Sequence, residues 1–466
     1  MKVEQLYTGC LAEAAYYIES CGEAAIIDPL RETSPYLKRA EKDGAKIKYI
    51  FETHFHADFV SGHVELASKT GATIVYGPNA ACDFSCHTAQ DNEEFKIGKL
   101  TLKVLHTPGH TPESSTYLLL NEEGKPHCIF TGDTLFIGDV GRPDLAIKSN
   151  VTMNDLAGML YDSLRNRIMT LPDDVVVYPA HGAGSSCGKN LSKETFDTLG
   201  HQKQSNYALQ PMSKEEFVKA VTEGLSAPPQ YFPKNAMLNK QGAKALDEVM
   251  QQGLKEWNPN DFENLAESTQ ALILDTRPAT TFVKGFVPGS IFIGLEGQFA
   301  PWVGALIKDL TQPILLVCEA GKEEECVMRL ARVGYDNTIG YLAGGIDAWK
   351  AAGKAADSLT SISADDFAAN HYSAAINLLD VRRPGEFEGG HISTADNKPL
   401  DYINDWTTEV SHNKTYYIHC AGGYRSVIAA SILKARGYDK LVDIAGGWKT
   451  ISATSLPKES GVSLKK

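Results

Sequence analysis

Short apolar runs alternate with polar loops over roughly the first 200 residues, which predicts a sheet-rich α/β domain. Between these strands, residues 61–70 have the pattern of a helix. The expected strands lie at residues 48–51, 73–76, 100–105, 115–120, 128–131 and 175–178. Residues with metal-binding side chains follow several of these strands directly, so the sequence predicts a site on loops at the sheet edge.

The rest of the chain is a linker followed by an internal repeat. Residues 209–253 contain several prolines and little strand pattern, so we expect helices mixed with extended chain there. After the linker, similar segments recur with a period of roughly 100 residues. Leu274-Asp275-Thr276-Arg277 matches Leu379-Asp380-Val381-Arg382, and Ala343-Gly344-Gly345 matches Ala445-Gly446-Gly447. Each copy alternates strands with helices, which predicts two small α/β domains with mostly parallel sheets. The predicted domains span residues 1–240, 256–355 and 360–460.

Composition narrows the class of protein. A length of 466 residues exceeds one ordinary core, and 43% hydrophobic with 22% charged residues is typical of a soluble globular protein. The N-terminus has no apolar signal segment, and no apolar run reaches the roughly 18 residues that span a bilayer. We therefore expect a cytoplasmic protein without a membrane partner. The net charge of −13 argues against nucleic acid. Nine scattered cysteines indicate free thiols, Cys82 and Cys86 included.

Four motifs with metal-binding residues follow the predicted strands. They are Thr53-His54-Phe55-His56-Ala57-Asp58, His110 in Thr-Pro-Gly-His, Asp133 in Thr-Gly-Asp, and His181 in Pro-Ala-His-Gly. This ordered set resembles the metallo-β-lactamase fold over about the first 200 residues, and the resemblance implies an αββα sandwich. Most two-metal members carry a histidine directly after the aspartate of the first run. Here that position is Phe59, and a phenyl ring has no lone pair for a second metal.

The first three motifs together resemble the persulfide dioxygenase branch of that fold. The resemblance implies one Fe(II) per chain, held by His54, His110 and Asp133. Two imidazoles and one carboxylate leave open positions that suit non-haem Fe(II) and oxygen, although zinc also binds such ligands. We expect His56, Asp58 and His181 to orient the ligands or to accept protons beside them, with direct ligation as the alternative.

Three further residues are candidates for binding the substrate. Arg142 is suited to anchoring a carboxylate, because a guanidinium binds carboxylates bidentately, and the alternative is a structural ion pair with a nearby aspartate. Lys189 is a candidate contact for an anionic substrate. Cys187 is a candidate for holding sulfur near the metal, and the alternative is an ordinary loop residue.

A cysteine opens a glycine-rich turn in the second repeat. Cys420-Ala-Gly-Gly-Tyr-Arg425-Ser426 lies between a predicted strand at 416–418 and a predicted helix at 427–435. Successive backbone N–H groups, the helix N-terminus and Arg425 would stabilise a thiolate and its persulfide. The loop resembles the rhodanese active site, with Cys420 and Arg425 as its catalytic residues. The corresponding Cys318 is surrounded by four glutamates, which indicates a degenerate copy used for packing.

The order of these domains is similar to that of bacterial persulfide dioxygenase–sulfurtransferase fusions of sulfide detoxification. The resemblance implies that O₂ oxidises a low-molecular-weight thiol persulfide to sulfite and free thiol. Cys420 would then pass a sulfane sulfur to sulfite, giving thiosulfate. The thiol is left open among glutathione, coenzyme A and bacillithiol, and a homo-oligomer is expected. Two alternatives are a glyoxalase II-like thioester hydrolase fused to a rhodanese, and a non-catalytic sulfur carrier or sensor.

Overall fold

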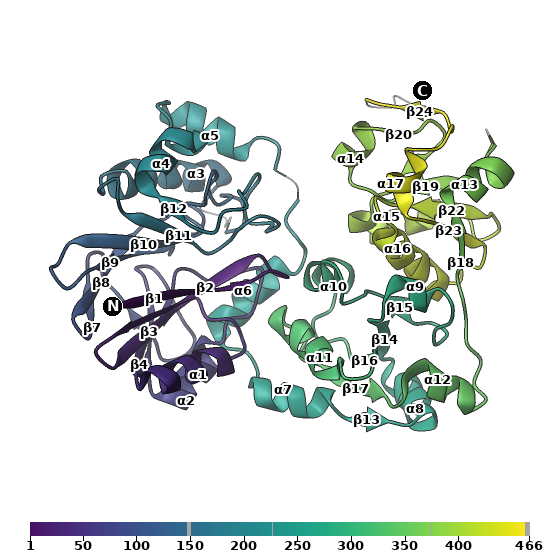
Figure 1. Cartoon of the computed structure of the whole chain (residues 1–466), viewed down its shortest axis with the longest axis horizontal. Helices are drawn as coiled ribbons and strands as arrows, with labels where there is room; N and C mark the ends of the chain where they lie inside the picture. Colours follow the sequence, from purple (N-terminus) through teal and green to yellow (C-terminus); the bar gives the residue numbers. More distant parts are fainter. Residues whose placement is uncertain (147–150, 226, 374, 462–466) are drawn as a thin grey trace. The chain divides into compact units, whose positions relative to one another are not determined.

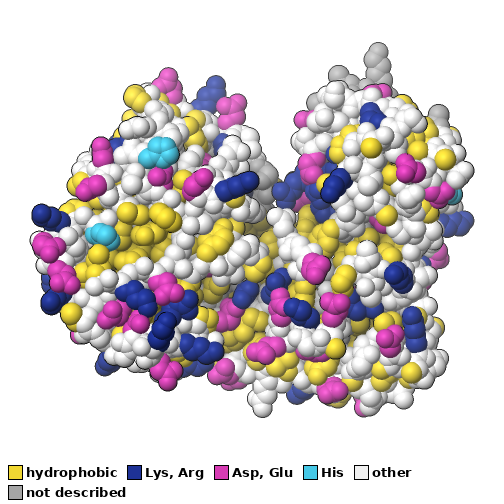
Figure 2. Space-filling view, in the orientation of Figure 1, with side chains coloured by type: hydrophobic (Ala, Val, Ile, Leu, Met, Phe, Trp, Pro, Cys, Tyr) yellow, Lys and Arg dark blue, Asp and Glu magenta, His cyan; other side chains and the backbone are white. Residues whose placement is uncertain are grey.

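The computed structural model describes residues 1–146, 151–225, 227–373 and 375–461. The chain forms two compact units. The first comprises Met1–Leu246 with Ala331–Gly334, and the second comprises Asp247–Leu330 with Tyr335–Lys466. None of the helices in the described ranges has the length and apolarity needed to cross a membrane. On the face drawn in Figure 2, Lys and Arg side chains are interspersed with Asp and Glu side chains on each unit.

Two six-stranded sheets make up the centre of the first unit (Figure 1). The first sheet has the order β1 (Lys2–Thr8), β2 (Glu13–Ser20), β3 (Glu23–Ile27), β4 (Lys46–Glu52), β5 (Thr73–Tyr76) and β6 (His87–Thr88). The second has the order β12 (Asp197–Thr198), β11 (Val176–Pro179), β10 (Pro126–Gly132), β9 (Ser115–Leu120), β8 (Leu100–His106) and β7 (Glu94–Ile97). Alternate side chains of both sheets, such as Phe51 and Tyr117, form one buried core. The expected strands are all present.

Helices cover the outer face of each sheet in the first unit (Figure 1). α1 (Ser34–Asp43) and α2 (His63–Thr70) bury Tyr36 and Leu66 against the first sheet. α3 (Met153–Ser163), α4 (Leu199–Ser205) and α5 (Lys214–Thr222) pack on the second sheet in a separate apolar cluster. The unit is therefore the four-layer αββα sandwich that the sequence predicted. The linker is helical, with α6 (Phe232–Gln241) and α7 (Leu246–Gly253) after α5.

The second unit contains two five-stranded sheets with the same strand order. The first is β13 (Glu256–Trp257), β17 (Thr338–Leu342), β16 (Ile314–Val317), β14 (Leu272–Asp275) and β15 (Ile291–Phe292). The second is β18 (Thr360–Ser363), β23 (Leu441–Ala445), β22 (Tyr416–His419), β19 (Leu378–Asp380) and β21 (Asp396–Asn397). All strand pairs within these two sheets are parallel. The shared order confirms the internal repeat.

Helices connect the parallel strands of both copies. In the first copy they are α8 (Pro259–Thr269), α9 (Ala279–Phe282), α10 (Phe299–Leu306), α11 (Glu323–Arg332) and α12 (Gly345–Ala351). In the second they are α13 (Ala364–Asp366), α14 (Pro384–Glu388), α15 (Ile403–Trp406), α16 (Tyr424–Ala435) and α17 (Gly447–Ile451). α16 begins at Tyr424, three residues before the expected start at residue 427, because Gly423 at φ 92° forms the left-handed turn that starts the helix.

Candidate metal centre and sulfur-carrier loop

The candidate metal ligands follow strands of both sheets in the first unit. His54 follows β4, whereas His110 and Asp133 follow β8 and β10 of the second sheet. His181 follows β11. All four side chains are buried. The fold therefore gathers residues separated by more than a hundred positions in sequence at one edge of the sandwich.

His54, His110 and Asp133 place ligand atoms within 4.8 Å of one another. The Oδ2 atom of Asp133 lies 3.4 Å from His110 Nε2 and 3.9 Å from His54 Nε2. Among the residues that the structure describes, no hydrogen-bond partner reaches this oxygen, although it is fully buried. A buried carboxylate oxygen facing two imidazole nitrogens is a costly arrangement unless a cation joins them. The three residues fit a metal ion.

Hydrogen bonds fix the tautomers of the two imidazoles. The Thr53 hydroxyl donates to Asp28 Oδ2 at 2.8 Å, so its oxygen accepts from His54 Nδ1 at 3.0 Å. The Nδ1 atom of His110 donates to the Arg142 carbonyl oxygen at 2.9 Å. Both rings therefore keep their Nε2 lone pair directed at Asp133, as metal ligation requires.

The protonation states also suit metal binding. Burial lowers the pKa of His54 well below its usual range, which keeps the imidazole neutral. Burial alone would raise the pKa of Asp133, but His181, His110 and His54 outweigh it and lower this pKa. Neutral imidazoles and an ionised carboxylate are the forms that bind metals.

His181 bridges two carboxylates beside the three candidate ligands. Its Nδ1 lies 2.8 Å from Asp133 Oδ1, and its Nε2 lies 2.8 Å from Asp58 Oδ2. Burial would lower the pKa of His181, but Asp133 and Asp58 raise it well above the usual value, so both ring nitrogens donate. Phe59 is fully buried and lies beside the His56 ring, with the ring centroids 4.4 Å apart and the planes tilted by 33°. Asp58, His181 and Cys187 also place ligand atoms within 4.8 Å of one another, but both nitrogens of His181 are hydrogen-bonded to carboxylates and position 59 offers only a phenyl ring.

His56 faces a different cluster, formed by residues that the sequence analysis did not identify. Its Nε2 lies 3.1 Å from Asp28 Oδ1 and 3.5 Å from Glu52 Oε2. Burial, reinforced by Asp28, raises the pKa of Glu52 well above its usual range. Asp28 also accepts from the Thr53 backbone at 2.7 Å, so it supports the loop that carries His54. The position of Asp28 directly after the apolar strand β3 was a signal that could have found it.

Glu13 is a second buried acid that the sequence analysis missed. It is fully buried opposite His181 in an isolated β-bridge, and its carboxyl oxygens have no hydrogen-bond partner among the described residues. Burial raises its pKa well above the usual value, which favours the neutral acid. A glutamate within the apolar run of residues 11–18 was the available sequence signal.

The three predicted substrate contacts have different surroundings. The Arg142 guanidinium forms two 2.7 Å hydrogen bonds with Asp144, which is the structural ion pair considered as the alternative. Lys189 donates to the Ala220 carbonyl oxygen at 2.8 Å, at the end of α5. Cys187 is buried with its sulfur within 4.8 Å of Asp58 and His181 ligand atoms. Of these three side chains, that of Cys187 lies beside the candidate metal centre, whereas Arg142 contacts His110 through its backbone carbonyl oxygen. The substrate roles of all three stay predictions.

The expectation of free thiols at Cys82 and Cys86 was wrong, because the structure joins them in a disulfide. The two residues enclose a short loop in which Phe84 lies on His63, with ring centroids 5.0 Å apart. Packing of this loop against an apolar cluster brings the two thiols together. The other seven cysteines are free.

Cys420 lies at the turn between β22 and α16 in the second unit. Its sulfur accepts a hydrogen bond from Gly423 N–H at 3.1 Å and lies 3.6 Å from the Ser426 hydroxyl oxygen. Its carbonyl oxygen accepts from Trp448 N–H at 2.6 Å. A Cβ on Gly447 would lie 2.3 Å from that oxygen, which explains the glycine in the repeated Ala-Gly-Gly motif. The loop thus places the Gly423 N–H donor and the N-terminus of α16 beside the sulfur.

Arg425 is held by a residue that the sequence analysis missed. Its guanidinium forms two 2.7 Å hydrogen bonds with the Glu386 carboxylate from α14. The Glu386 hydrogen bond raises the pKa of Arg425 against the effect of burial, and Cys420 also contributes to the increase. The guanidinium is therefore anchored beside the cysteine loop as a fixed positive charge.

The first copy has no such arginine in its loop. A hydrogen bond with Cys326, burial and Glu323 all raise the pKa of Cys318, which disfavours its thiolate. The Thr276 hydroxyl lies 3.2 Å from the Cys326 sulfur. These surroundings agree with the predicted effect of the acidic residues, although the neighbouring thiol contributes more.

Comparison with known families assigns the fold. The profile of the metallo-beta-lactamase superfamily matches residues 8–181, and that of the rhodanese-like domain matches residues 258–352 and 363–454. The chain therefore belongs to the metallo-beta-lactamase superfamily and carries two rhodanese-like domains after its lactamase-like domain. It is an enzyme of that superfamily, and its His and Asp residues form a candidate metal site.

Individual relatives of this chain include enzymes with two different activities, at the same sequence identity. The mitochondrial persulfide dioxygenase ETHE1 of Homo sapiens is 32% identical over 42% of this chain and 70% of its own length. A cytoplasmic hydroxyacylglutathione hydrolase of Arabidopsis thaliana is also 32% identical, over 37% of this chain and 65% of its own length. The crystal structure of a metallo-beta-lactamase from Staphylococcus aureus subsp. aureus COL is 32% identical with a TM-score of 0.65, covering 73% of this chain and 98% of that one. Identity alone does not separate oxygenase from hydrolase.

Proposed function

We propose that the first unit is a persulfide dioxygenase and that the last domain is a sulfurtransferase acting on its product. The observation that carries the first part is the set of His54, His110 and Asp133 beside a histidine, His181, whose two nitrogens are both hydrogen-bonded to carboxylates. A thioester hydrolase of this fold works best with two metals and a bridging hydroxide, whereas an oxygenase needs one metal with open positions.

Each residue of the candidate centre has a separate task in this proposal. His54, His110 and Asp133 would hold one Fe(II), and bound iron supplies the activation of O₂ and the binding of the persulfide sulfur. His181 orients the Asp133 carboxylate and holds protons between it and Asp58. The buried Phe59 ring would offer no ligand to a second metal beside Asp58.

The overall oxidation balances with water as the third reactant. A thiol persulfide RSSH, O₂ and H₂O give RSH and sulfurous acid, which ionises to sulfite. The terminal sulfur is oxidised, both atoms of O₂ are reduced, and the S–S bond breaks with its electron pair leaving on the thiol. Cys187, whose sulfur lies within 4.8 Å of ligand atoms of Asp58 and His181, would be the thiol that contacts the persulfide.

Sulfur transfer would take place at Cys420. Its thiolate attacks the terminal sulfur of a second persulfide, so that a new S–S bond forms and RSH leaves after taking a proton. Sulfite then attacks the terminal sulfur on Cys420, which forms thiosulfate and returns the thiolate. The N–H of Gly423 and the charge of Arg425 stabilise the anionic sulfur in both states. Because one chain carries both sites, the sulfite produced at one is concentrated near the other.

Two measurements on the full chain test the proposal. Anaerobically purified protein should contain one iron per chain, and glutathione persulfide should cause O₂ uptake above the blank. Two zinc ions per chain with hydrolysis of a glutathione thioester would instead support the hydrolase. Protein that contains one metal but consumes no O₂ with glutathione, coenzyme A or bacillithiol persulfide would exclude the dioxygenase.

A further inference from the structure

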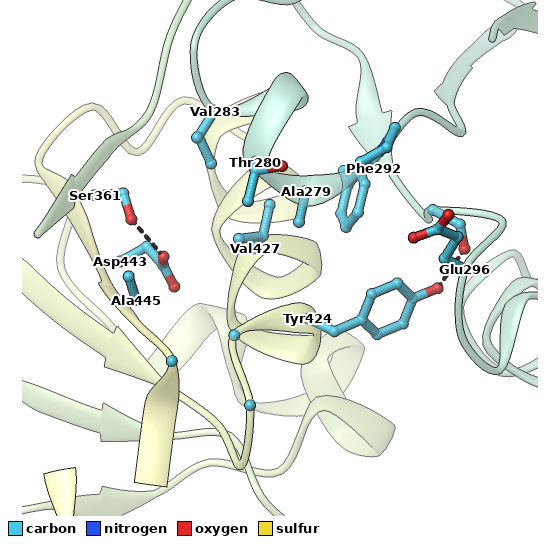
Figure 3. A pocket seen from close by; sticks show the side chains of 15 residues that line it. Ala279, Thr280, Val283, Phe292, Glu296, Ser361, Tyr424, Val427, Asp443 and Ala445 are labelled. Carbon is cyan, nitrogen blue, oxygen red and sulfur yellow. Dashed lines mark hydrogen bonds between the residues drawn. The ribbon is translucent and has the colours of Figure 1, made fainter. Parts of the chain in front are cut away.

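The second unit contains a pocket of about 290 Å³ that the proposed function does not use. α9 and β15 of the first rhodanese-like domain form one side of it (Figure 3). The Cys420 loop, the start of α16 and the end of β23 form the other side. The first copy, whose own cysteine loop is degenerate, therefore contributes half of a site beside the intact loop.

The pocket combines apolar walls with acidic groups. Val283, Phe292 and Val427 supply apolar surface. Asp443 with Ser361 lies on one side of the view in Figure 3, and Glu296 lies on the other. None of the lining residues is Lys, Arg or His. Such a lining disfavours sulfite, thiosulfate and other anions, and it favours a cation with an apolar body.

Asp443 is a buried acidic residue of the pocket, and one of its carboxylate oxygens is open to a ligand. Its side chain is 2% exposed and accepts from the Ser361 hydroxyl at 2.8 Å through Oδ2. Its Oδ1 accepts no hydrogen bond of normal geometry within the described part of the chain. Burial raises the pKa of this carboxyl, and the hydroxyls of Ser426 and Ser361 offset the increase only in part. An ammonium group would satisfy the open oxygen and the acidic charge together.

We propose that this pocket binds a small organic amine, with its ammonium group on Asp443 and Ser361 and its apolar body against Val283 and Val427. Glu296, which is exposed, adds negative charge that attracts the cation. The site goes beyond the proposed function, because it takes a ligand of opposite charge to sulfite. It shares Gly423 with the sulfur loop, and the N–H of that glycine donates to Cys420 Sγ. A bound amine therefore contacts the backbone that holds the sulfur.

Three probes of similar shape and different charge test this site on the full chain. They are 1-aminobutane, butan-1-ol and butanoate, and their binding is measured by calorimetry and by ligand-observed NMR. We expect the amine to bind at least about tenfold more tightly than the alcohol, and butanoate not to bind. Binding should persist in Cys420→Ser, because the site does not depend on sulfur chemistry. Failure of the dioxygenase or sulfurtransferase proposal would leave this result unchanged.

Variants assign the binding to the pocket. Asp443→Asn and Glu296→Gln should each weaken amine binding, the first by at least about tenfold, because the buried charge lies at the ammonium site. Ala279→Leu, which adds bulk to a lining residue, should exclude both the amine and the alcohol. Glu324→Gln, the same change on an exposed face of α11, should have no effect. Equal binding of butanoate and amine, or amine binding unchanged in both Glu296→Gln and Ala279→Leu, would overturn the proposal even if Asp443→Asn fails to fold.

Discussion

The Nδ1 atom of His181 lies 2.8 Å from Oδ1 of Asp133, and this hydrogen bond determines the role of the second carboxylate oxygen. With Oδ1 engaged, Oδ2 faces the Nε2 atoms of His54 and His110. One histidine thus orients the carboxylate that completes the set of three candidate ligands. The same histidine uses its other nitrogen to hold Asp58.

Removal of the Asp133 carboxylate should empty the metal site. Asp133→Ala leaves only two imidazoles and frees His181, so iron per chain and O₂ uptake with glutathione persulfide should both fall to background. Elemental analysis and an oxygen electrode measure these quantities. Asp162→Ala, which removes an exposed carboxylate paired with Lys214, is the matched control and should keep its iron. Iron retained at the wild-type level in a folded Asp133→Ala protein would show that the ligand assignment is wrong.

Gly141 should be required for the geometry of the same centre. A Cβ at this position would lie 2.0 Å from the Asp133 carbonyl oxygen and 3.0 Å from His110 Nδ1. Gly141→Ala must therefore displace the Asp133 backbone or the His110 ring, which lie on two different loops, and we expect iron content to fall severalfold. Gly9→Ala is the control in the same domain, since nothing lies within 4 Å of its added Cβ. Equal iron in the two variants would contradict this account.

The strands depend on local pattern and could be predicted from it, whereas the αββα layers and the three candidate ligands followed from the family resemblance. Strand periodicity located β4, β8, β10 and β11, and the ends of these strands located His54, His110, Asp133 and His181. Folding then had only to bring the strand ends together. The Cys420 loop could also be located from sequence, because the strand before it and the helix after it are adjacent along the chain.

What the sequence did not predict were partners supplied by distant segments. Glu386 lies 39 residues before Arg425 and belongs to another helix, so no local pattern links them. The orientation of His56 toward Asp28 and Glu52, away from the three candidate ligands, likewise depends on packing between β3 and β4. The pairing of Arg142 with Asp144 was considered from sequence, but choosing it over a substrate contact required the side-chain geometry.

Loss of the Cys420 thiol should separate the two proposed reactions. In Cys420→Ser, thiosulfate formation should stop while sulfite accumulates at the wild-type rate of O₂ uptake, because the serine hydroxyl cannot carry sulfane sulfur. Ion chromatography of the products measures both anions. Cys318→Ser should behave as wild type, since its surroundings disfavour the thiolate. Thiosulfate produced by Cys420→Ser at an undiminished rate would mean that another cysteine is the carrier.

The ion pair of Glu386 and Arg425 should make stability depend on acid pH. The hydrogen bond from Arg425 lowers the pKa of Glu386 below its ordinary value of 4.5. The resulting stabilisation is present above the unfolded-state pKa and is lost as the pH falls through the lower folded-state pKa. Because the Glu386 side chain is 37% exposed, we expect the ion pair to add less than about 1 kcal/mol to the free energy of unfolding.

Urea unfolding of the wild type and of Glu386→Gln measures the difference between their free energies of unfolding. The wild type should be the more stable protein near pH 7, and the two should converge once the pH falls below the lowered folded-state pKa of Glu386. Glu388→Gln, a change on the same helix, serves as the control. A difference that stays constant as the pH falls through that pKa would assign the effect to packing instead of charge.

Replacement of Phe59 tests whether its phenyl ring limits the proposed centre to one metal. Phe59→His restores an imidazole next to Asp58, so Asp58, His181 and the new histidine can compete for a second ion. We expect zinc-loaded Phe59→His to retain two metals per chain after dialysis, compared with one in the wild type. Burial of an imidazole in place of a phenyl ring should also reduce stability by about 1–3 kcal/mol. Phe59→Leu keeps the site apolar and should bind one metal. Two zinc ions in the wild type would show that the phenyl ring does not exclude the second metal, and the hydrolase would then be the better assignment.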